Sequence, residues 1–514
     1  MTQYDYVVIG AGSAGCVVAN RLTLDRQTTV LLLEAGNPDT KPEIQIPAEY
    51  LKLICSEVDW GYFSEPEPYL DNRKMFYSAG KVLGGSSSIN NMLYVRGNSR
   101  DYDHWQSLGN FGWSYQDVLP YFKKSEHYSR GANEYHGVNG ELNVTDQEAP
   151  ATVSQRFVEA CVLLGYDYNP DFNATKQRGV GLFQLNIKDG KRHSAATAFL
   201  SPIKKRSNLT ATTGALVTRL LFEGARAVGV EYLHKGTLHQ ARVNQEVILS
   251  AGTINSPKLL LQSGIGAAKS LQARGISVVV DLPGVGKNLQ DHIVVPVAYM
   301  ATQNIDLAIT SSGTEAGLFL HSEGNLDALP DLEIMFSPIH EAVPSSYYCS
   351  SGFIGSVVLM HPHNIGSISL QRTISNAGRT PDPQEKPIIR LNYLQNQSDV
   401  RLLTAGVKLI RQLFEENAFD EFRGEEIAPG SQVQSDEAFE AYIREICSSG
   451  NHAVGTCKMG IDQMAVVDPE LRVHGVEGLR VVDASIIPTL ITGHTNATTI
   501  MIGEKAADLI KAAN

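Results

Sequence analysis

Cysteine is scarce in this sequence: six cysteines are spread over 514 residues, and no two have the CxxC spacing. That spacing is typical of zinc sites and redox motifs, whereas closely spaced cysteines in a short chain are typical of disulfide-stabilised secreted domains. The sequence therefore predicts neither a disulfide framework nor a structural zinc site, and we expect no metal ligands. A reducing, cytoplasmic compartment is the expected location.

Basic residues are also fewer than acidic residues. The 43 lysines and arginines are outnumbered by 55 acidic residues, so the formal net charge is -12. Proteins that bind nucleic acid present a basic surface to it, and we expect no such partner here. No apolar run reaches the length of a transmembrane helix. The apolar N-terminal stretch carries Asp5 where a secretory signal has basic residues, so we interpret it as part of the fold.

What the sequence does contain begins with a nucleotide-binding pattern. The apolar run at residues 6–9 is followed at once by GxGxxG at Gly10, Gly12 and Gly15. We interpret the run as a buried strand and residues 14–22 as the helix after it. The first glycine allows a tight turn, the second lets the backbone approach a pyrophosphate, and the third lets helix and strand pack closely. Phosphate would then lie at the helix N-terminus.

A second apolar run, residues 29–33, ends in Glu34. An acid about 20 residues after the glycines can accept hydrogen bonds from the ribose hydroxyls of an adenosine. The order of strand, glycines, helix, strand and acid predicts a dinucleotide-binding site. Both NAD and FAD fit this pattern.

Two further segments are dense in small residues. Residues 80–91 read GKVLGGSSSINN, and residues 252–266 read GTINSPKLLLQSGIG after an apolar run at 247–249. Such segments let the backbone come close to a flat ring or a phosphate. In the second segment, Ser256 and Pro257 predict the start of a helix, and Ser263 and Gly264 predict its end.

With these segments the sequence resembles the glucose–methanol–choline (GMC) family of flavoprotein oxidoreductases. Both segments are similar to that family's signatures, and stretches at 94–97, 101–105, 112–114, 189–195 and 283–292 extend the resemblance over almost the whole chain. The resemblance implies an α/β fold. It consists of a discontinuous Rossmann-like FAD-binding domain and a substrate domain with a mostly antiparallel sheet and helices.

The resemblance also implies bound FAD. Relatives that attach FAD covalently use a histidine of the first signature, and the matching residue here is Ile89, so we expect non-covalent FAD. Val217 should contact adenine through its backbone, and Asp483 should lie near the ribityl chain or the pyrophosphate. The full set of expected cofactor-binding residues is Gly10, Gly12, Ser13, Gly15, Glu34, Gly80, Val82, Gly84, Ser88, Asn90, Asn91, Val217, Asp483, Ala484 and Asn496.

The expected chemistry lies near the C-terminus. By resemblance, His452 matches the catalytic histidine of the family and Asn496 matches its partner. A neutral histidine can take the hydroxyl proton of an alcohol at physiological pH while a hydride passes to the flavin. An amide can orient the alcohol oxygen. Taken alone, His452 would be interpreted as a structural histidine, and Asn496 could also cap a final helix at 497–512. His494 is a further candidate for substrate contact.

The expected domains alternate along the chain. The FAD-binding domain comprises residues 1–155, 196–300 and 446–514, and the substrate domain comprises 156–195 and 301–445. Alternating stretches at 331–336 and 366–370 predict antiparallel strands, and Ser398 is expected to cap a helix that carries Leu403, Val407, Ile410 and Phe414.

The expected function is FAD-dependent oxidation of a primary alcohol to an aldehyde, with oxygen or another electron acceptor completing turnover. Choline-acting relatives carry an aromatic residue just before the catalytic histidine, where this chain has Asn451. Since quaternary ammonium groups call for an aromatic cage, we expect a neutral aliphatic or aryl alcohol. The alternatives are a non-oxidising enzyme of the same fold, of the hydroxynitrile lyase or fatty-acid photodecarboxylase type, and an NAD-binding protein without flavin. The pattern gives no prediction of the oligomeric state.

Overall fold

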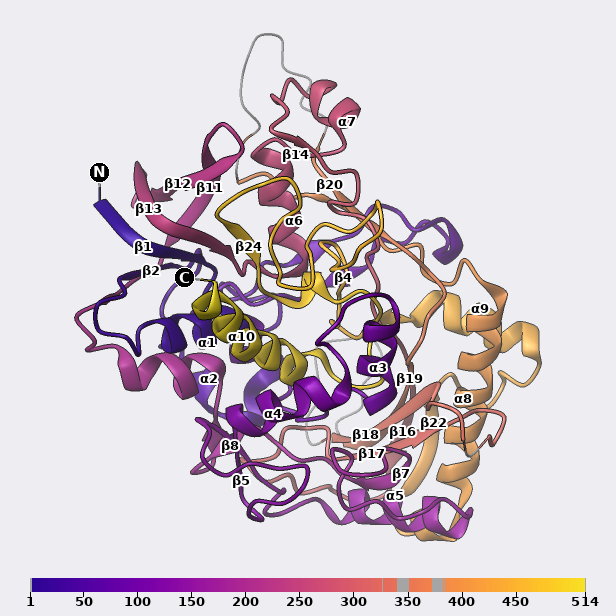
Figure 1. Cartoon of the computed structure of the whole chain (residues 1–514). Coiled ribbons are helices and arrows are strands. Elements are labelled where there is room, and N and C mark those ends of the chain that lie inside the picture. Colours follow the sequence, from indigo (N-terminus) through magenta and orange to yellow (C-terminus); the bar gives the residue numbers. More distant parts are fainter. Residues whose placement is uncertain (1, 326, 340–350, 372–381, 383, 514) are drawn as a thin grey trace.

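The N-terminal glycine motif forms the expected strand, turn and helix. A computed structural model describes residues 2–325, 327–339, 351–371, 382 and 384–513 (Figure 1). Strand β1 (Thr2–Ile9) leads into helix α1 (Ser13–Leu22). Gly10 has a φ of +95°, and a Cβ there would lie 2.4 Å from the carbonyl oxygen of Ser250. Only glycine fits this turn, because a side chain would be strained and would also clash with a neighbouring loop.

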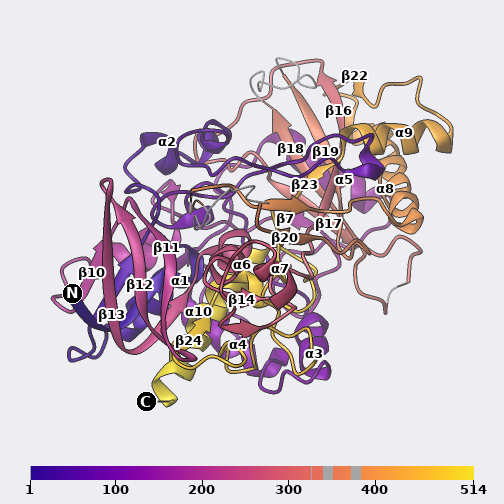
Figure 2. The same ribbon diagram turned by 90° about the horizontal axis from the view of Figure 1, so that it is seen from above.

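The first large sheet is assembled from distant parts of the chain. Its central strands are parallel, and an antiparallel hairpin extends one side. In Figure 2 this sheet lies on the left, apart from the other large sheet of the protein, which lies at the upper right. The strands run in the order β10 (Leu209–Thr212), β2 (Val30–Leu33), β1, β13 (Thr237–Leu249), β12 (Arg226–His234) and β11 (Ala215–Glu223), with β24 (Leu479–Val481) also paired to β13.

The C-terminal helix returns to the N-terminal motif. Helix α10 (Thr495–Ala512) lies beside α1, and both chain ends lie on the same side of the molecule (Figure 1). A Cβ at Gly503 would lie 2.9 Å from the carbonyl oxygen of Ala14, so the two helices approach backbone to backbone. This packing places the residues just before α10 next to the glycine loop after β1.

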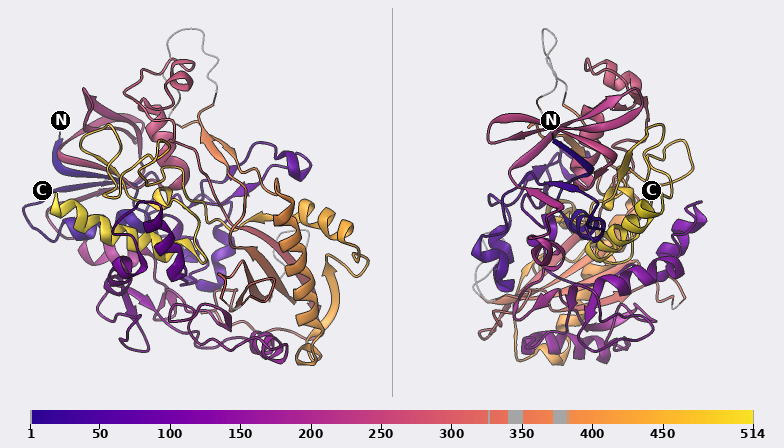
Figure 3. Two further views of the ribbon diagram at one scale, coloured as in Figure 1. Left: turned by 45° about the vertical axis from the view of Figure 1, so that its right-hand side comes forward. Right: turned by 60° about the vertical axis from the view of Figure 1, so that its left-hand side comes forward.

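The second large sheet is antiparallel and is covered by helices α8 (Gln397–Glu415) and α5 (Thr152–Leu163) (Figure 3). Along β16, Val295 and Val297 are buried in the core beneath these helices, while the alternate residues Val294 and Pro296 face the opposite side. The strand order is β22 (Arg423–Ala428), β16 (Ile293–Ala301), β19 (Gly352–Leu359), β18 (Leu332–Ile339), β17 (Ala316–Leu320) and β7 (Gly179–Leu182), with β23 (Ser448–Ser449) also paired to β16.

Smaller elements connect the two sheets. The other α-helices are α2 (Pro42–Gln45), α3 (Ser99–Ser107), α4 (Tyr115–Ser125), α6 (Gly252–Gln262), α7 (Ala268–Gln272) and α9 (Asp436–Ile446). Short paired strands are β3 (Tyr62–Phe63) with β4 (Phe76–Tyr77), β5 (Glu126–Tyr128) with β6 (Leu142–Val144), β8 (Ile187–Lys188) with β9 (Lys191–Arg192), β14 (Ile265–Gly266) with β15 (Val280–Asp281), and β20 (Ser367–Ser369) with β21 (Ile388–Arg390).

Helix α6 begins earlier than expected from Ser256 and Pro257. It starts at Gly252, so Pro257 lies inside the helix. A proline removes the hydrogen bond to the carbonyl four residues before it. That carbonyl belongs to Thr253, and the Thr456 hydroxyl donates to it at 2.5 Å. The helix therefore continues through the proline because a distant side chain replaces the lost bond.

Two helix caps also differ from the prediction. The residue that caps α8 is Asn396, whose side chain accepts a hydrogen bond from the Ser398 N–H. The capping position of α10 is His494, so Asn496 lies within the first turn and does not cap the helix. In both cases several polar residues lie near the start of the helix. The backbone conformation at which the helix begins decides which of them occupies the cap, and the sequence alone does not fix that position.

The two sheets support a division into a FAD-binding and a substrate domain. The first sheet draws its strands from residues 2–9, 30–33, 209–249 and 479–481, and the second from residues 179–182 and 293–449. We propose the predicted alternation of segments with two changes. The boundary expected at residue 445 lies after Ser449, because β23 pairs with β16 in the second sheet. The boundary expected at residue 300 lies before Ile293, because β16 pairs in the second sheet.

Within the described ranges, no helix is both long and apolar enough to cross a membrane. The five described cysteines are free. The cytoplasmic location stays a prediction.

Candidate active site

Three loops of the first domain meet backbone to backbone. A Cβ on Gly85 would lie 2.7 Å from the Cα of Gly12, and the turn at Gly10 touches Ser250, just before α6. Small residues in each loop make these contacts possible. Beside the loops lies a cavity of about 1010 Å³, whose opposite wall is the second sheet.

Eleven of the fifteen residues expected to bind the cofactor line this cavity: Gly10, Gly12, Ser13, Glu34, Gly80, Asn90, Asn91, Val217, Asp483, Ala484 and Asn496. The other four, Gly15, Val82, Gly84 and Ser88, are not part of the lining. Gly15 packs against the carbonyl of Gly10, and the Ser88 hydroxyl donates to the Leu83 carbonyl at 2.7 Å. These residues shape the loops from behind.

Glu34 lies at the end of β2, as the sequence predicts. Its carboxylate accepts hydrogen bonds from the N–H groups of Ala11 at 2.9 Å and Gly36 at 2.8 Å. Burial raises the pKa of Glu34 to about 7, although these bonds oppose the shift. Glu34 thus lines the cavity, and its carboxylate also stabilises the glycine turn through the Ala11 N–H.

Asp483 joins the last segment of the chain to α6. Its Oδ2 accepts from the Ser256 hydroxyl at 2.5 Å and from the Gly252 N–H at 2.9 Å. The Ser485 N–H donates to Oδ1 at 2.8 Å. Burial raises the pKa of Asp483 above its ordinary value. The acid fixes the loop after β24 against the third glycine-rich loop.

The residues of the cavity fit a dinucleotide such as FAD. Among them, Asn91 Oδ1 and Ser250 Oγ are buried and have no hydrogen-bond partner among the residues that the structure describes. Buried polar atoms are rarely left in this state, so such atoms indicate a polar ligand. Together with the glycine loops, the N-terminus of α1 and the Glu34 carboxylate, they form the donor and acceptor set that FAD requires.

His452 lies on the cavity where the two domains meet. Its backbone N–H donates to Asp291 Oδ1 at 2.7 Å, and its Nδ1 lies 2.9 Å from Nδ1 of His292. Desolvation, together with the nearby imidazoles of His494 and His292, lowers the pKa of His452 well below its usual range. A neutral imidazole is the form that can accept a proton.

His494 and Asn496 come from the start of α10 and line the same cavity. The His494 ring lies 5.0 Å from the His452 ring, centroid to centroid, and its Nε2 lies 3.1 Å from a carboxylate oxygen of Glu333. The Asn496 Oδ1 accepts a hydrogen bond from the Ser13 hydroxyl at 2.7 Å. The structure therefore brings together all three residues expected near the reacting alcohol.

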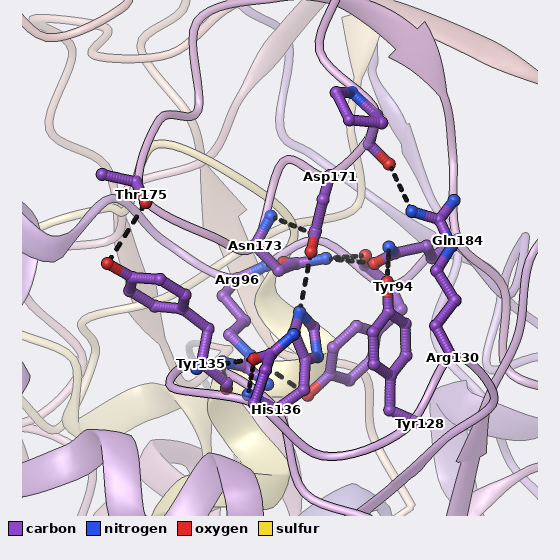
Figure 4. A network of polar contacts seen from close by, with 12 residues as sticks. Tyr94, Arg96, Tyr128, Arg130, Tyr135, His136, Asp171, Asn173, Thr175 and Gln184 are labelled. Atoms are coloured by element: carbon purple, nitrogen blue, oxygen red, sulfur yellow. Dashed lines mark hydrogen bonds and ion pairs between the residues drawn. The ribbon is translucent and has the colours of Figure 1, made fainter.

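A buried polar network supports the residues just before α10 through the segment at 95–96, and Figure 4 shows its members Arg96, His136 and Asp171. His136 lies between Glu126 and Asp171, at 3.2 and 3.0 Å, and Arg96 pairs with Glu126 at 2.8 Å. The carbonyl of Val95, next to Arg96, accepts the backbone N–H of His494 at 3.3 Å. The ion pairs thus fix the extended loop segment at residues 95–96, to which the backbone of His494 is bonded.

The wall opposite the glycine loops is mostly apolar. Same-face residues of β16, β18 and β19 line it, and cross-strand partners stand side by side, for example Pro296 beside Ser356 and Ser356 beside Met335. The wall comprises Val294, Pro296, Met335, Ser337, Ile339, Ile354, Ser356 and Val358. This surface suits the apolar part of a substrate.

The GMC oxidoreductase family matches residues 4–294 and 363–503 of the chain. The chain belongs to this family. The GMC oxidoreductase is 42% identical to the mitochondrial choline dehydrogenase of Homo sapiens over 99% of this chain and 90% of that protein. It is also 42% identical to the oxygen-dependent choline dehydrogenase of Brucella anthropi over 99% of this chain and 95% of that protein.

Among solved structures, pyridoxine 4-oxidase from Mesorbium loti superposes with a TM-score of 0.91 at 30% identity, over 98% of each chain. These findings confirm the resemblance and the α/β fold with a mixed FAD-binding sheet and an antiparallel substrate-domain sheet. The protein is an FAD-dependent GMC oxidoreductase that acts on CH–OH groups. The alternative of an NAD-binding protein without flavin is therefore wrong.

Sequence reasoning did not single out two residues of this GMC oxidoreductase site, His292 and Glu333. His292 is the last residue of the family-like stretch at 283–292, and that stretch is the signal that points to it. Glu333 lies in the alternating stretch at 331–336, which predicted a strand but gave no sign that its polar residue points at a histidine of another domain.

Proposed function

We propose that the enzyme oxidises a primary alcohol to an aldehyde, with His452 as the base and Asn496 as the residue that orients the alcohol. The observation that carries the proposal is the meeting of His452, His494 and Asn496 on one cavity with the three glycine-rich loops. A base, a hydrogen-bond donor and a cofactor site within one cavity are the parts that this reaction needs.

Each residue contributes a separate part of the chemistry. His452 takes the hydroxyl proton, which leaves the carbinol carbon free to release a hydride. When bound, FAD supplies the acceptor for that hydride. The Oδ1 of Asn496 is held by Ser13, so its NH₂ group is left to donate to the alcohol oxygen. The N-terminus of α10 adds the positive end of a helix dipole at the same place.

We further propose that FAD is bound without a covalent link. Ile89 stands where some relatives carry the linking histidine, and its side chain is buried at the cavity wall. A hydrocarbon side chain offers no atom for such a bond. The test is to denature the yellow protein with acid: the colour should pass into the supernatant, and colour that stays with the precipitate would contradict the proposal.

The substrate we propose is a neutral alcohol, although the two curated relatives are named for choline. The carboxylates on the described cavity lining are Glu34, Glu49 and Asp483. Glu34 and Asp483 accept backbone N–H bonds, and Glu49 pairs with Lys52 at 2.9 Å. Glu333, beside the cavity, is paired with His494. Along the described part of the lining, a quaternary ammonium group would therefore meet no uncommitted negative charge, and Asn451 stands where choline-acting relatives have an aromatic residue.

The test is an anaerobic screen of alcohols against the purified holoenzyme. We expect neutral primary alcohols to bleach the flavin much faster than choline does, and we expect the aldehyde as product. Faster bleaching by choline would contradict the substrate assignment. No bleaching by any alcohol would contradict the reaction itself and favour a non-oxidising enzyme of the same fold. Admission of air then shows which acceptor reoxidises the flavin. Fast recovery of the yellow colour indicates oxygen, and slow recovery indicates that another electron acceptor is used.

A further inference from the structure

His292 contacts the ring of the proposed base in a geometry that restricts its protons. It directly precedes β16, it is fully buried, and its ring meets the His452 ring edge to face at a centroid distance of 5.1 Å. The two Nδ1 atoms are 2.9 Å apart. A contact this short between ring nitrogens requires one proton, so one nitrogen must donate and the other must accept.

The other nitrogen of His292 decides which one donates. Its Nε2 lies 3.1 Å from the carbonyl oxygens of both Met360 and Ile491. Carbonyl oxygens can only accept, so Nε2 must carry a proton. Besides His452, which this ring contacts, two further imidazoles, those of His361 and His494, act on its charge. Burial and these neighbours lower the pKa of His292 to about 3, so the ring is neutral and holds a single proton.

It follows that Nδ1 of His292 is the acceptor and Nδ1 of His452 is the donor. We infer that His292 is a positioning residue that holds His452 as the Nδ1–H tautomer and thereby leaves the lone pair on Nε2 to receive the substrate proton. The role in proton transfer rests on the proposed function, whereas the tautomer rests only on the contacts of His292.

The preceding residue fixes the backbone of the base. Asp291 accepts the N–H of His452, and its other oxygen accepts from the Tyr393 hydroxyl at 2.5 Å and from the Ser449 hydroxyl. Two adjacent residues, Asp291 and His292, therefore hold both the main chain and the ring of His452. Such double support removes the freedom of the imidazole to turn over.

The proton balance is simple. The O–H bond of the alcohol breaks, and an N–H bond forms at Nε2 of His452. The resulting imidazolium keeps its Nδ1–H bond to His292. No proton passes further, because the contacts of His292 Nε2–H within the described part of the chain are two carbonyl oxygens, which cannot take up a proton. His292 thus stabilises the charged ring without exchanging its own proton.

The test reads the tautomer directly. The holoenzyme, labelled with ¹⁵N-histidine and free of alcohol, is examined by NMR, and the His452 signals are assigned by their loss in His452→Gln. We expect a protonated Nδ1 and an unprotonated Nε2 near neutral pH. An Nε2–H signal for His452 would overturn the inference, whether or not any variant of His292 folds.

Two variants of His292 separate positioning from simple support of the fold. In His292→Asn the amide oxygen takes the place of Nδ1 and can still accept from His452, so the tautomer and most of the flavin-reduction rate should persist. In His292→Gln the amide takes the place of Nε2 and keeps the carbonyl contacts but offers His452 no acceptor. We expect mixed tautomers and a reduction rate about 10- to 100-fold lower.

Equal rates and an Nδ1–H tautomer in both variants would also overturn the inference. If instead the tautomer is as expected but His452→Ala is reduced normally by alcohol, the proposed base is wrong while the inference about His292 stands.

Discussion

The Ser13 hydroxyl donates a hydrogen bond to Asn496 Oδ1 at 2.7 Å and so joins the first turns of α1 and α10, 483 residues apart. Ser13 follows the first glycine turn, and Asn496 follows His494 at the start of α10. Their contact fixes the amide of Asn496 with its oxygen toward α1, so its NH₂ group is the part left for the alcohol.

This contact predicts the behaviour of three variants. Asn496→Asp retains an acceptor for Ser13 but cannot donate to the alcohol oxygen, so flavin reduction should slow by about 100-fold. Ser13→Ala frees the amide to rotate and should cost about 10-fold, whereas Ser13→Thr keeps the hydroxyl and should stay near the wild-type rate. Anaerobic stopped-flow measurement of flavin reduction checks all three. Equal rates in Ser13→Ala and Ser13→Thr would show that the hydrogen bond does not orient the amide.

The His494–Glu333 pair predicts a change in charge selectivity. His494→Asn removes the ring whose Nε2 contacts the buried Glu333 carboxylate at 3.1 Å, and the loss of this hydrogen-bond partner should destabilise the protein by about 2 kcal/mol. The Glu333 carboxylate would then lie next to the cavity without a partner, and its negative charge should raise kcat/KM for choline relative to a neutral alcohol. Both parameters can be measured on the purified variant, by chemical unfolding and by steady-state kinetics.

The double variant His494→Asn/Glu333→Gln is the control for this prediction. It removes the carboxylate together with the histidine, so most of the lost stability should return and choline should again be disfavoured. A gain in choline activity that persists in the double variant would show that space, and not the charge of Glu333, governs selection.

The buried network around His136 predicts a pH dependence of stability. Although burial opposes it, hydrogen bonds with Asp171 and Glu126 raise the pKa of His136 above its ordinary value. Burial also opposes the shifts of the two carboxyls, but Arg96 and His136 lower the pKa of Glu126, and His136 lowers the pKa of Asp171. The contribution of His136 is fully present below its unfolded pKa of about 6.5 and is lost as pH rises through its folded pKa. The carboxyls contribute above their unfolded pKa of about 4 and lose this contribution as pH falls.

His136→Gln keeps hydrogen-bonding groups but removes the titration. Near pH 6 the variant should be less stable than wild type by about 3 kcal/mol, and the difference should shrink as pH rises above 7. Unfolding in guanidinium at several pH values measures this difference. A difference that stays constant from pH 6 to about 9 would mean that His136 is not charged in the native network.

Local signals in the sequence predicted the first turn of the fold well. The glycine spacing, the apolar runs and Glu34 lie within about 30 residues, and the turn, α1 and β2 follow from them. The start of α6 was not predictable in this way. Pro257 reads as a helix start, and the Thr456 hydroxyl that lets the helix extend before it comes from a loop about 200 residues later.

The supporting residues of the site were missed for the same reason. His292 and His452 are 160 residues apart, and Glu333 and His494 are 161 residues apart. The first pair forms when β23 pairs with β16 in the second sheet, where the Gly450 N–H donates to the His292 carbonyl at 2.8 Å, and the second pair forms when that sheet docks on the first domain. Glu333 also follows the alternation of a strand with one solvent-facing side, and the sequence does not show that His494 and the apolar cluster around Val95 and Phe183 cover that side.

The most direct test of the account is the reduction of FAD by a neutral primary alcohol, without oxygen, in His452→Ala. The matched control is His239→Ala, which removes an exposed histidine on the hairpin between β12 and β13. We predict that both variants are yellow, that the control is bleached at the wild-type rate, and that His452→Ala is bleached at least about 100-fold more slowly. Bleaching of His452→Ala at the rate of the control would contradict the assignment of His452 as the base.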